Sequence, residues 1–208
     1  MEQLPEIEAA TAGLSATEML RELLTTWFPG EVAVTASLRA PSIVVLKIIS
    51  DIDPSTPVIF CHPRQVFPES EEYRAEIVGL LGLTNVQVVT GSDPVTRKRP
   101  FERCERLWSE TPDGMGRSKE TIHLNDTLAP YRCWIKAAYH ERTVGSADQR
   151  FYCYGGKVIV DALRGRSREL IDRFMQAHRL PYHPRISHRK KPVEAALMTD
   201  APDIGWHF

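Results

Sequence analysis

The sequence predicts an α/β fold, with a mostly parallel, doubly wound sheet and helices on both of its faces. Three short, β-prone apolar runs alternate with two helical segments in the first ninety residues, and the connections between them are short. Such units form right-handed crossovers between parallel strands, which are buried on both faces. The 208 residues are enough for one domain. We expect that domain over residues 1–185, followed by a C-terminal tail over residues 186–208.

The first predicted element is a helix over residues 15–28. Ser15 and Glu18 have the spacing of a capping box, and apolar side chains follow them at helical spacing. A β-prone run at residues 31–37 predicts the first strand, and an apolar run at residues 42–52 predicts the second helix. These elements open the strand and helix alternation on which the fold class rests.

The alternation continues toward the middle of the chain. Residues 57–61 (PVIFC) predict a buried strand, and Pro68 stands at the favoured first position of a helix that ends before Gly82. Residues 86–89 predict a third strand. The second half predicts a helix followed by a strand within residues 124–140, a strand at residues 158–161 and a helix at residues 167–179.

Two loops are the first candidates for a ligand site. Ligands of parallel α/β sheets bind beyond the carboxyl ends of the strands, and the loops at residues 37–42 and 62–68 follow the first two strands. Residues 1–96 carry 5 basic and 13 acidic side chains, whereas residues 97–208 carry 21 and 14. Nine Lys and Arg residues lie within residues 164–191, a segment that would attract phosphates, nucleotides or nucleic acid. A solvated charged face is the alternative interpretation.

We expect a cytoplasmic protein without a membrane segment. No apolar run approaches the roughly 20 residues that cross a bilayer, and the acidic N-terminus lacks the features of a secretory signal. Four cysteines are present, and they are widely separated, without a CxxC pair; they are Cys61, Cys104, Cys133 and Cys153. This usage favours reduced thiols over a disulfide framework.

An ordered set of sequence phrases identifies a family resemblance. The phrases are residues 51–59 (DIDPSTPVI), 67–69 (FPE), 80–83 (LLGL), 124–135 (LNDTLAPYRCWI) and 158–184, which ends in LPYHP. Together they resemble the sulfonucleotide reductases, in particular the phosphoadenosine phosphosulfate (PAPS) reductase family. The resemblance implies an adenine nucleotide alpha hydrolase-like, Rossmann-like fold that binds PAPS or adenosine phosphosulfate (APS). It also implies a homodimer in sulfur metabolism, in which a C-terminal cysteine attacks sulfur and thioredoxin or glutaredoxin releases sulfite.

The cysteine of that reaction is missing from the matching phrase. The family carries E-C-G-[LI]-H near the C-terminus, and residues 203–207 read DIGWH here, so that Ile204 stands at the cysteine position. Isoleucine has no lone pair with which to attack sulfur. Unless folding brings Cys133 or Cys153 to the site, we therefore expect a pseudoenzyme, with no catalytic residue.

We expect no cofactor and no metal. The iron–sulfur branch of the family carries a cysteine pair where Met115-Gly116 stands here, and the C-terminal segment contains no cysteine. An iron–sulfur cluster is therefore not expected. His178, His183 and His188 recur at intervals of five residues, but the prolines between them prevent a shared helix face.

The nucleotide loops differ from the family as well. The first keeps Ser37 and Ser42 but contains Pro41 and no glycine, and Arg39 offers a positive charge. In the second loop, the acidic D-T-G turn of the family is replaced by a basic turn. The third phosphate-binding segment of the family contains an arginine pair; the matching segment here lacks that pair, although it retains other cations. The candidate nucleotide- or phosphate-binding residues are Ser37, Arg39, Ser42, His62, Arg64, Lys136, His140 and Arg142.

Three functions follow from these observations. The leading hypothesis is a divergent family member that binds an adenine nucleotide, a sulfonucleotide or a protein partner without the thiol-dependent reduction. One alternative is an active PAPS reductase-like enzyme of sulfate assimilation with a relocated site. The other is a nucleic-acid- or protein-binding module that uses the basic segment at residues 164–191.

Overall fold

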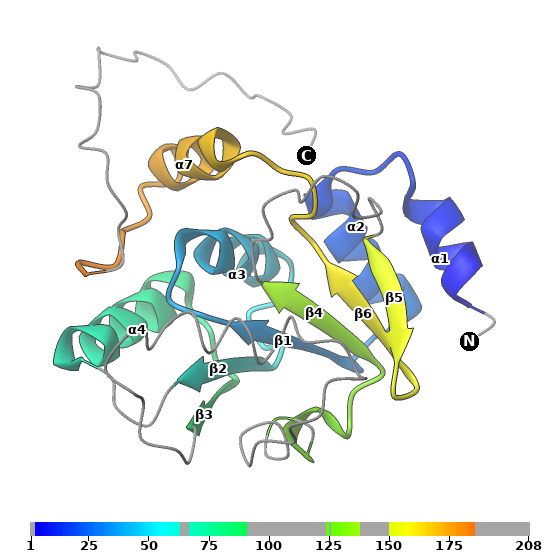
Figure 1. Ribbon diagram of the computed structural model, residues 1–208, viewed down its shortest axis with the longest axis horizontal. Coiled ribbons are helices and arrows are strands. Elements are labelled where there is room, and N and C mark those ends of the chain that lie inside the picture. The colour runs from blue at the N-terminus through cyan, green and yellow to red at the C-terminus, as the bar shows by residue number, and fades with distance from the viewer. Residues whose placement is uncertain (1–2, 63–66, 91–123, 125, 138–149, 186–208) are drawn as a thin grey trace, which may run out of the picture.

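The computed structural model describes residues 3–62, 67–90, 124, 126–137 and 150–185. These residues form one six-stranded sheet in the order β3-β2-β1-β4-β6-β5 (Figure 1). Neighbouring strands pair in parallel, except for β5, which pairs antiparallel with β6 at one edge. The strands are β1 Val32–Ala36, β2 Val58–His62, β3 Val86–Thr90, β4 Cys133–Ala137, β5 Phe151–Tyr154 and β6 Lys157–Asp161. The predicted α/β fold with a mostly parallel sheet is therefore confirmed.

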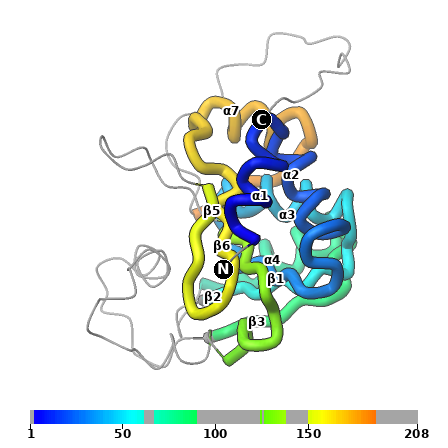
Figure 2. The backbone as a smooth tube through the Cα atoms, turned by 90° about the vertical axis from the view of Figure 1, so that its right-hand side faces the viewer, coloured from blue at the N-terminus to red at the C-terminus, as the bar shows by residue number. Residues whose placement is uncertain are grey.

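Helices α2, α4 and α7 gather around α3 on one face of the sheet, and each of them contacts α3 (Figures 1 and 2). The elements are α1 Leu4–Thr11, α2 Ala16–Glu22, η1 Leu23–Trp27, α3 Ala40–Ile52, α4 Pro68–Leu81 and α7 Arg168–Ala177. The capping box is present, because Ser15 accepts a hydrogen bond from the Glu18 N–H and Glu18 accepts one from the Ser15 N–H. The predicted helix at residues 15–28 is not α-helical throughout, since a π-helical turn, η1, forms its last part.

Alternate residues of each strand face opposite sides of the sheet. Val34 and Ile135, which are register partners on β1 and β4, belong to the main buried cluster under the helices. The opposite face carries a smaller buried cluster, formed by Ala33, Ile59, Leu124 and Leu128. Among the described residues, the segment at residues 124–131 therefore covers this second face. Within the same described ranges, no helix has the length and apolar character needed to cross a membrane.

Two described elements were not predicted from the sequence. β5 is a four-residue edge strand, and its sequence, FYCY, is too short to show a clear alternation. α1 has Pro5 in its first turn but no side chain that caps its first turn. The predicted tail at residues 186–208 lies outside the described residues.

The two glycines of α4 allow a matched test of its C-terminus. Gly82 ends the helix with a left-handed φ of 63°, whereas Gly79 lies inside the helix with open space around its Cβ position. We expect Gly82→Ala to lower the free energy of unfolding by about 1 kcal/mol, because a Cβ strains that backbone. Gly79→Ala should raise it by about 0.5–1 kcal/mol, because alanine loses less backbone entropy in a helix. Urea unfolding followed by circular dichroism measures both, and equal signs for the two variants would contradict this description.

Candidate functional site

The strand order reverses between β1 and β4. The chain runs from β1 outward to β2 and β3, then returns to the other side of β1 with β4, β6 and β5. Ligands of open α/β sheets bind outside the carboxyl ends of the strands at such a switch point. Here that position is occupied by the loop after β1, by the start of α3 and by the last residue of β4, Ala137.

Ser42 connects these three parts through hydrogen bonds. Its hydroxyl donates to the carbonyl of Ala137 and accepts from the N–H of Ser37 at 3.1 Å. The two serine hydroxyls are 2.9 Å apart, and the N–H of Arg39 donates to the Ser37 hydroxyl at 3.4 Å. Ser42 is only 1% exposed. This candidate therefore forms an internal brace at the switch point, and Ser37 and Arg39 lie beside it as predicted.

The start of α3 can favour an anion. The first N–H groups of a helix have no partner within the helix and form the positive end of its dipole. Arg39 is the N-cap residue, and its side chain makes no capping hydrogen bond. A cation at this position is repelled by the helix dipole, so an anion bound there would be attracted by both. Pro41 removes one N–H group from this turn, as expected from the sequence.

Lys136 lies in a polar network at the same edge of the sheet. It is 4% exposed, and its ammonium group donates to the Tyr152 hydroxyl at 3.1 Å. Its register partner on β6 is Asp161. Burial lowers the pKa of Lys136, while Asp161 opposes that shift. Lys136 is therefore a buried member of a network between β4, β5 and β6.

The other predicted site residues are less well placed by the structure. His62 ends β2 at the same edge of the sheet. Arg64, His140 and Arg142 lie outside the described residues. The structure therefore brings together Ser37, Arg39 and Ser42, and it places Lys136 on the neighbouring strand end.

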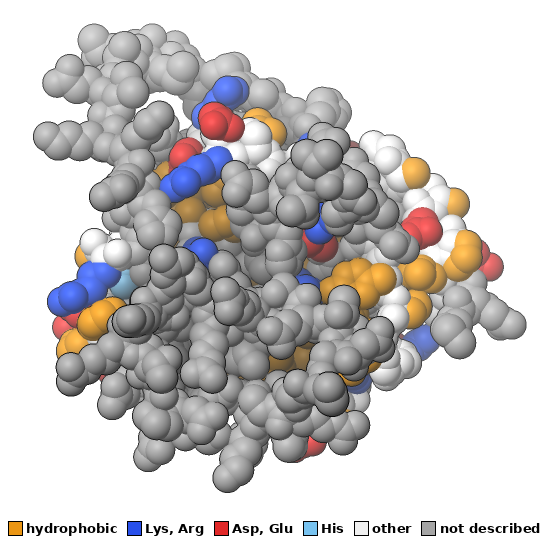
Figure 3. All heavy atoms as spheres, in the orientation of Figure 1, with side chains coloured by type: hydrophobic (Ala, Val, Ile, Leu, Met, Phe, Trp, Pro, Cys, Tyr) orange, Lys and Arg blue, Asp and Glu red, His pale blue; other side chains and the backbone are white. Residues whose placement is uncertain are grey.

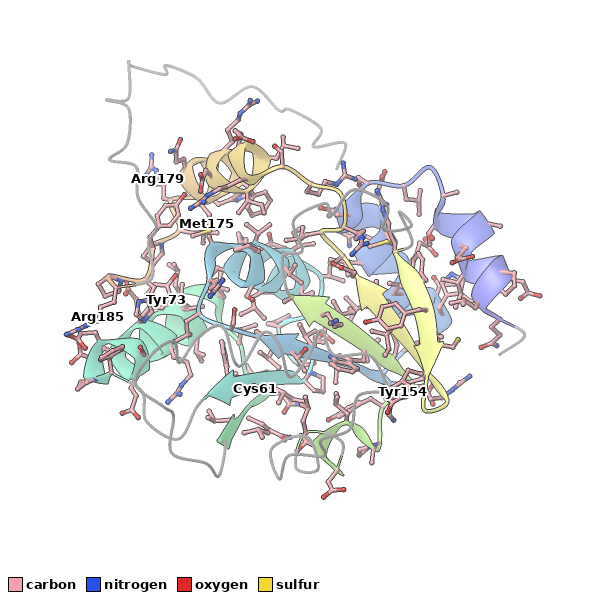
Figure 4. All side chains as sticks on the ribbon, viewed as in Figure 1. Cys61, Tyr73, Tyr154, Met175, Arg179 and Arg185 are labelled. Carbon is pink, nitrogen blue, oxygen red and sulfur yellow. The ribbon has the colours of Figure 1, made fainter. Side chains whose placement is uncertain are left out.

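The described cysteines lie in three different environments. Cys133 begins β4 and is fully buried, and burial raises the pKa of its thiol to about 12. Cys153 is exposed on β5. Both are register partners of Val158 near the start of β6, so they lie toward the sheet edge opposite the switch point. Cys61 is the described cysteine near the carboxyl ends, on β2, far from Tyr154 on β5 (Figure 4).

Residues 180–185 contact the start of α4, and the sequence did not predict this contact. His183 is 2% exposed, and its Nε2 lies 2.9 Å from the Ser70 hydroxyl. Its Nδ1 accepts from the Arg185 N–H at 3.1 Å, and the Arg185 side chain donates to Glu69 at 2.6 Å. Tyr73 donates to the carbonyl of Pro181 at 2.7 Å. Figure 4 shows Tyr73 and Arg185 next to α4. The phrase LPYHP was the available signal, although it did not indicate the partner.

The described residues also bear on two other possible sites, a metal site and a nucleic-acid interface. Those residues contain no group of three His, Cys, Asp or Glu side chains placed to hold a metal ion. His178 stacks on Phe174 at 4.2 Å, apart from the Ser70 contact of His183. Over α7, at the start of the basic segment, Lys and Arg side chains lie next to Asp and Glu side chains (Figure 3). This face of α7 therefore lacks the continuous positive patch typical of nucleic-acid binding.

Comparison with known proteins identifies relatives along most of the chain. No family model matches the sequence. The adenosine 5'-phosphosulfate reductase of Mesorhizobium japonicum is 25% identical over 183 residues, which cover 88% of this chain and 71% of that protein. The phosphoadenosine 5'-phosphosulfate reductase of Shewanella oneidensis is 28% identical over 210 residues, with coverage of 94% and 84%.

A solved structure shares the fold. The crystal structure of a PAPS reductase from Candida auris, in a phosphate complex, has a TM-score of 0.63 and 15% sequence identity. The alignment covers 88% of this chain and 89% of that one. The chain is therefore similar in sequence to APS and PAPS reductases over most of its length, and it shares the fold of a PAPS reductase.

Proposed function

We propose that this chain binds an adenine nucleotide or sulfonucleotide at the carboxyl ends of β1 and β4 and does not carry out thiol-dependent reduction. The relatives are named as reductases of adenosine 5'-phosphosulfate and its 3'-phosphorylated form, which supports an adenosine sulfonucleotide as the ligand class. The positive end of α3 and Arg39 favour an anionic group at the switch point. Lys136 lies on the next strand end.

The position of the thiols carries the second half of the proposal. In the family reaction a thiolate attacks sulfur, and Ile204 stands at the position of that cysteine. Cys133 is buried with a raised pKa, so it stays protonated and weakly nucleophilic at neutral pH. Cys133 and Cys153 both lie toward the opposite edge of the sheet. These observations argue against either cysteine as a relocated nucleophile.

Binding and catalysis are tested on the same preparation. We expect AMP, ATP, APS, PAPS or adenosine 3',5'-bisphosphate to raise the melting temperature, since a ligand at 100 times its Kd adds about 2.7 kcal/mol. In contrast, APS or PAPS with thioredoxin and a reductant should release no sulfite. Loss of a nucleophile typically lowers kcat by more than about 10⁴-fold. The Mesorhizobium japonicum reductase is the positive control for sulfite release.

The two halves of the proposal fail in different ways. No rise in melting temperature with any of these compounds would overturn the binding proposal. Sulfite release in proportion to protein concentration would overturn the non-catalytic one. Cys61→Ser and Cys104→Ser variants would then identify the thiol that had replaced the missing cysteine.

A further inference from the structure

Asp161 holds a buried oxygen without a hydrogen-bond donor at the carboxyl end of β6. Its side chain is 5% exposed, and its Oδ2 lies 3.9 Å from the Arg164 Nη1. The other carboxylate oxygen, Oδ1, is buried and accepts no hydrogen bond from any group in the described part of the chain. Buried polar groups in native proteins are almost always paired, so such an oxygen requires an explanation.

Burial of this carboxylate disfavours its ionised form, whereas the neighbouring cations favour it. Burial is the largest effect and raises the pKa of Asp161 to about 6. Lys136 on β4, Arg164 after β6 and a hydrogen bond from the backbone N–H of Leu163 oppose this shift. At neutral pH the carboxylate is therefore mostly ionised, buried and short of one donor. A hydrogen bond from a ligand would offset part of this desolvation.

The register of the sheet places Asp161 in line with the switch point. Thr35 on β1 pairs with Lys136 on β4, and Lys136 pairs with Asp161 on β6. Because neighbouring strands are about 4.8 Å apart, Asp161 lies roughly 10 Å from β1 along the edge of the sheet. A nucleotide whose phosphate sits at the start of α3 would extend its nucleoside over β4 toward β6. Thr35 is already occupied, since its hydroxyl accepts from Trp134 at 2.7 Å.

We propose that the Oδ1 atom of Asp161 accepts a hydrogen bond from the nucleoside part of the bound nucleotide, either from a ribose hydroxyl or from the exocyclic amino group of adenine. Carboxylates take this role toward ribose hydroxyls in dinucleotide-binding α/β folds. Tyr152 is a positioning residue, because its hydroxyl holds Lys136 beside this carboxylate. This inference rests on the proposed nucleotide binding and adds the group that reads the nucleoside.

Calorimetric titration with AMP at pH 8 tests the contact. Asp161→Asn keeps the size of the side chain but removes its charge, and it should weaken AMP binding by about 10- to 100-fold. Asp51→Asn is the matched control, because that carboxylate is exposed and pairs with Lys47 on α3; its Kd should stay unchanged. Tyr152→Phe should weaken binding by less than about tenfold. Melting temperatures of all variants establish that they are folded.

Analogues of AMP identify the donor. 2'-Deoxy-AMP, 3'-deoxy-AMP and inosine monophosphate each remove one donor. The analogue that lacks the contacting group should bind the unmodified protein more weakly than AMP, and Asp161→Asn should not weaken it further. The pH profile gives an independent readout. AMP affinity should fall between pH 8 and pH 5 more steeply for the unmodified protein than for Asp161→Asn, because protonation removes the carboxylate acceptor.

The outcomes separate this inference from the proposed function. If the unmodified protein binds none of these nucleotides, the proposed function itself fails. If it binds AMP and Asp161→Asn leaves the Kd unchanged, the Asp161 contact is overturned while the nucleotide site stands. The contact is also overturned if Asp161→Asn weakens AMP and all three analogues by the same factor.

Discussion

Replacing Ser42 by alanine is expected to lower the free energy of unfolding by about 2–4 kcal/mol. The Ser42 hydroxyl, which is buried, donates to the buried carbonyl of Ala137 and accepts from the N–H of Ser37. Alanine would leave a carbonyl and an N–H group without partners, and each such group costs about 1–3 kcal/mol. Urea unfolding followed by tryptophan fluorescence measures the loss.

The same substitution should weaken nucleotide binding by at least about tenfold, because Ser42 sets the position of α3 relative to β4. Ser50→Ala is the control on the same helix. Its hydroxyl donates to the Lys47 carbonyl at a half-exposed position, so its effect on stability should stay within about 0.5 kcal/mol. Similar losses for the two variants would show that Ser42 has no special role at the switch point.

His183→Ala is expected to lower the free energy of unfolding by about 2–4 kcal/mol at pH 8. The substitution removes the contact with Ser70 at 2.9 Å and the acceptor of the Arg185 N–H at 3.1 Å. It also removes the edge contact with the Tyr73 ring, whose centroid is 5.1 Å away. A buried position that loses packing and two hydrogen bonds typically falls in this range. Urea unfolding at pH 8 measures it.

The contribution of His183 should also depend on pH. Because Nδ1 accepts a hydrogen bond, the ring is neutral and its proton lies on Nε2, which donates to Ser70. Burial lowers the pKa of His183, Arg185 adds to that shift and Glu69 opposes it. A histidine whose pKa is lowered in the folded state stabilises the protein at pH values above about 6.5, the pKa of histidine in the unfolded chain. This stabilisation is lost as the pH falls below about 6.5.

A non-titrating variant isolates this effect. His183→Gln keeps an acceptor and a donor, so its free energy of unfolding should fall less between pH 7.5 and pH 5.5 than that of the unmodified protein. His178 also has a pKa lowered by burial, and it accounts for acid sensitivity that remains in the variant. A pH profile identical to that of the unmodified protein would contradict the assignment of the proton to Nε2.

Most of the secondary structure could be predicted from the sequence, because the features that determine it are local. The capping box of Ser15 and Glu18, Pro68 at the start of α4 and Gly82 at its end each act within a few residues. The strand positions followed from short apolar runs. β5 was missed because four residues carry too little pattern, and the π-helical turn of η1 was missed because no local signal distinguishes it from α-helix.

The sequence also determines that residue 204 is isoleucine, and the prediction of a missing nucleophile rests on this residue, because no fold can give isoleucine a lone pair. The partners of the site residues were decided by the tertiary structure alone. Ser42 meets Ala137 across 95 residues of chain, and His183 meets Ser70 across 113. Such contacts depend on strand order and register, which the packing of the whole sheet sets. The sequence therefore named Lys136 as a candidate cation, while only the pairing of β4 with β6 placed it beside Asp161.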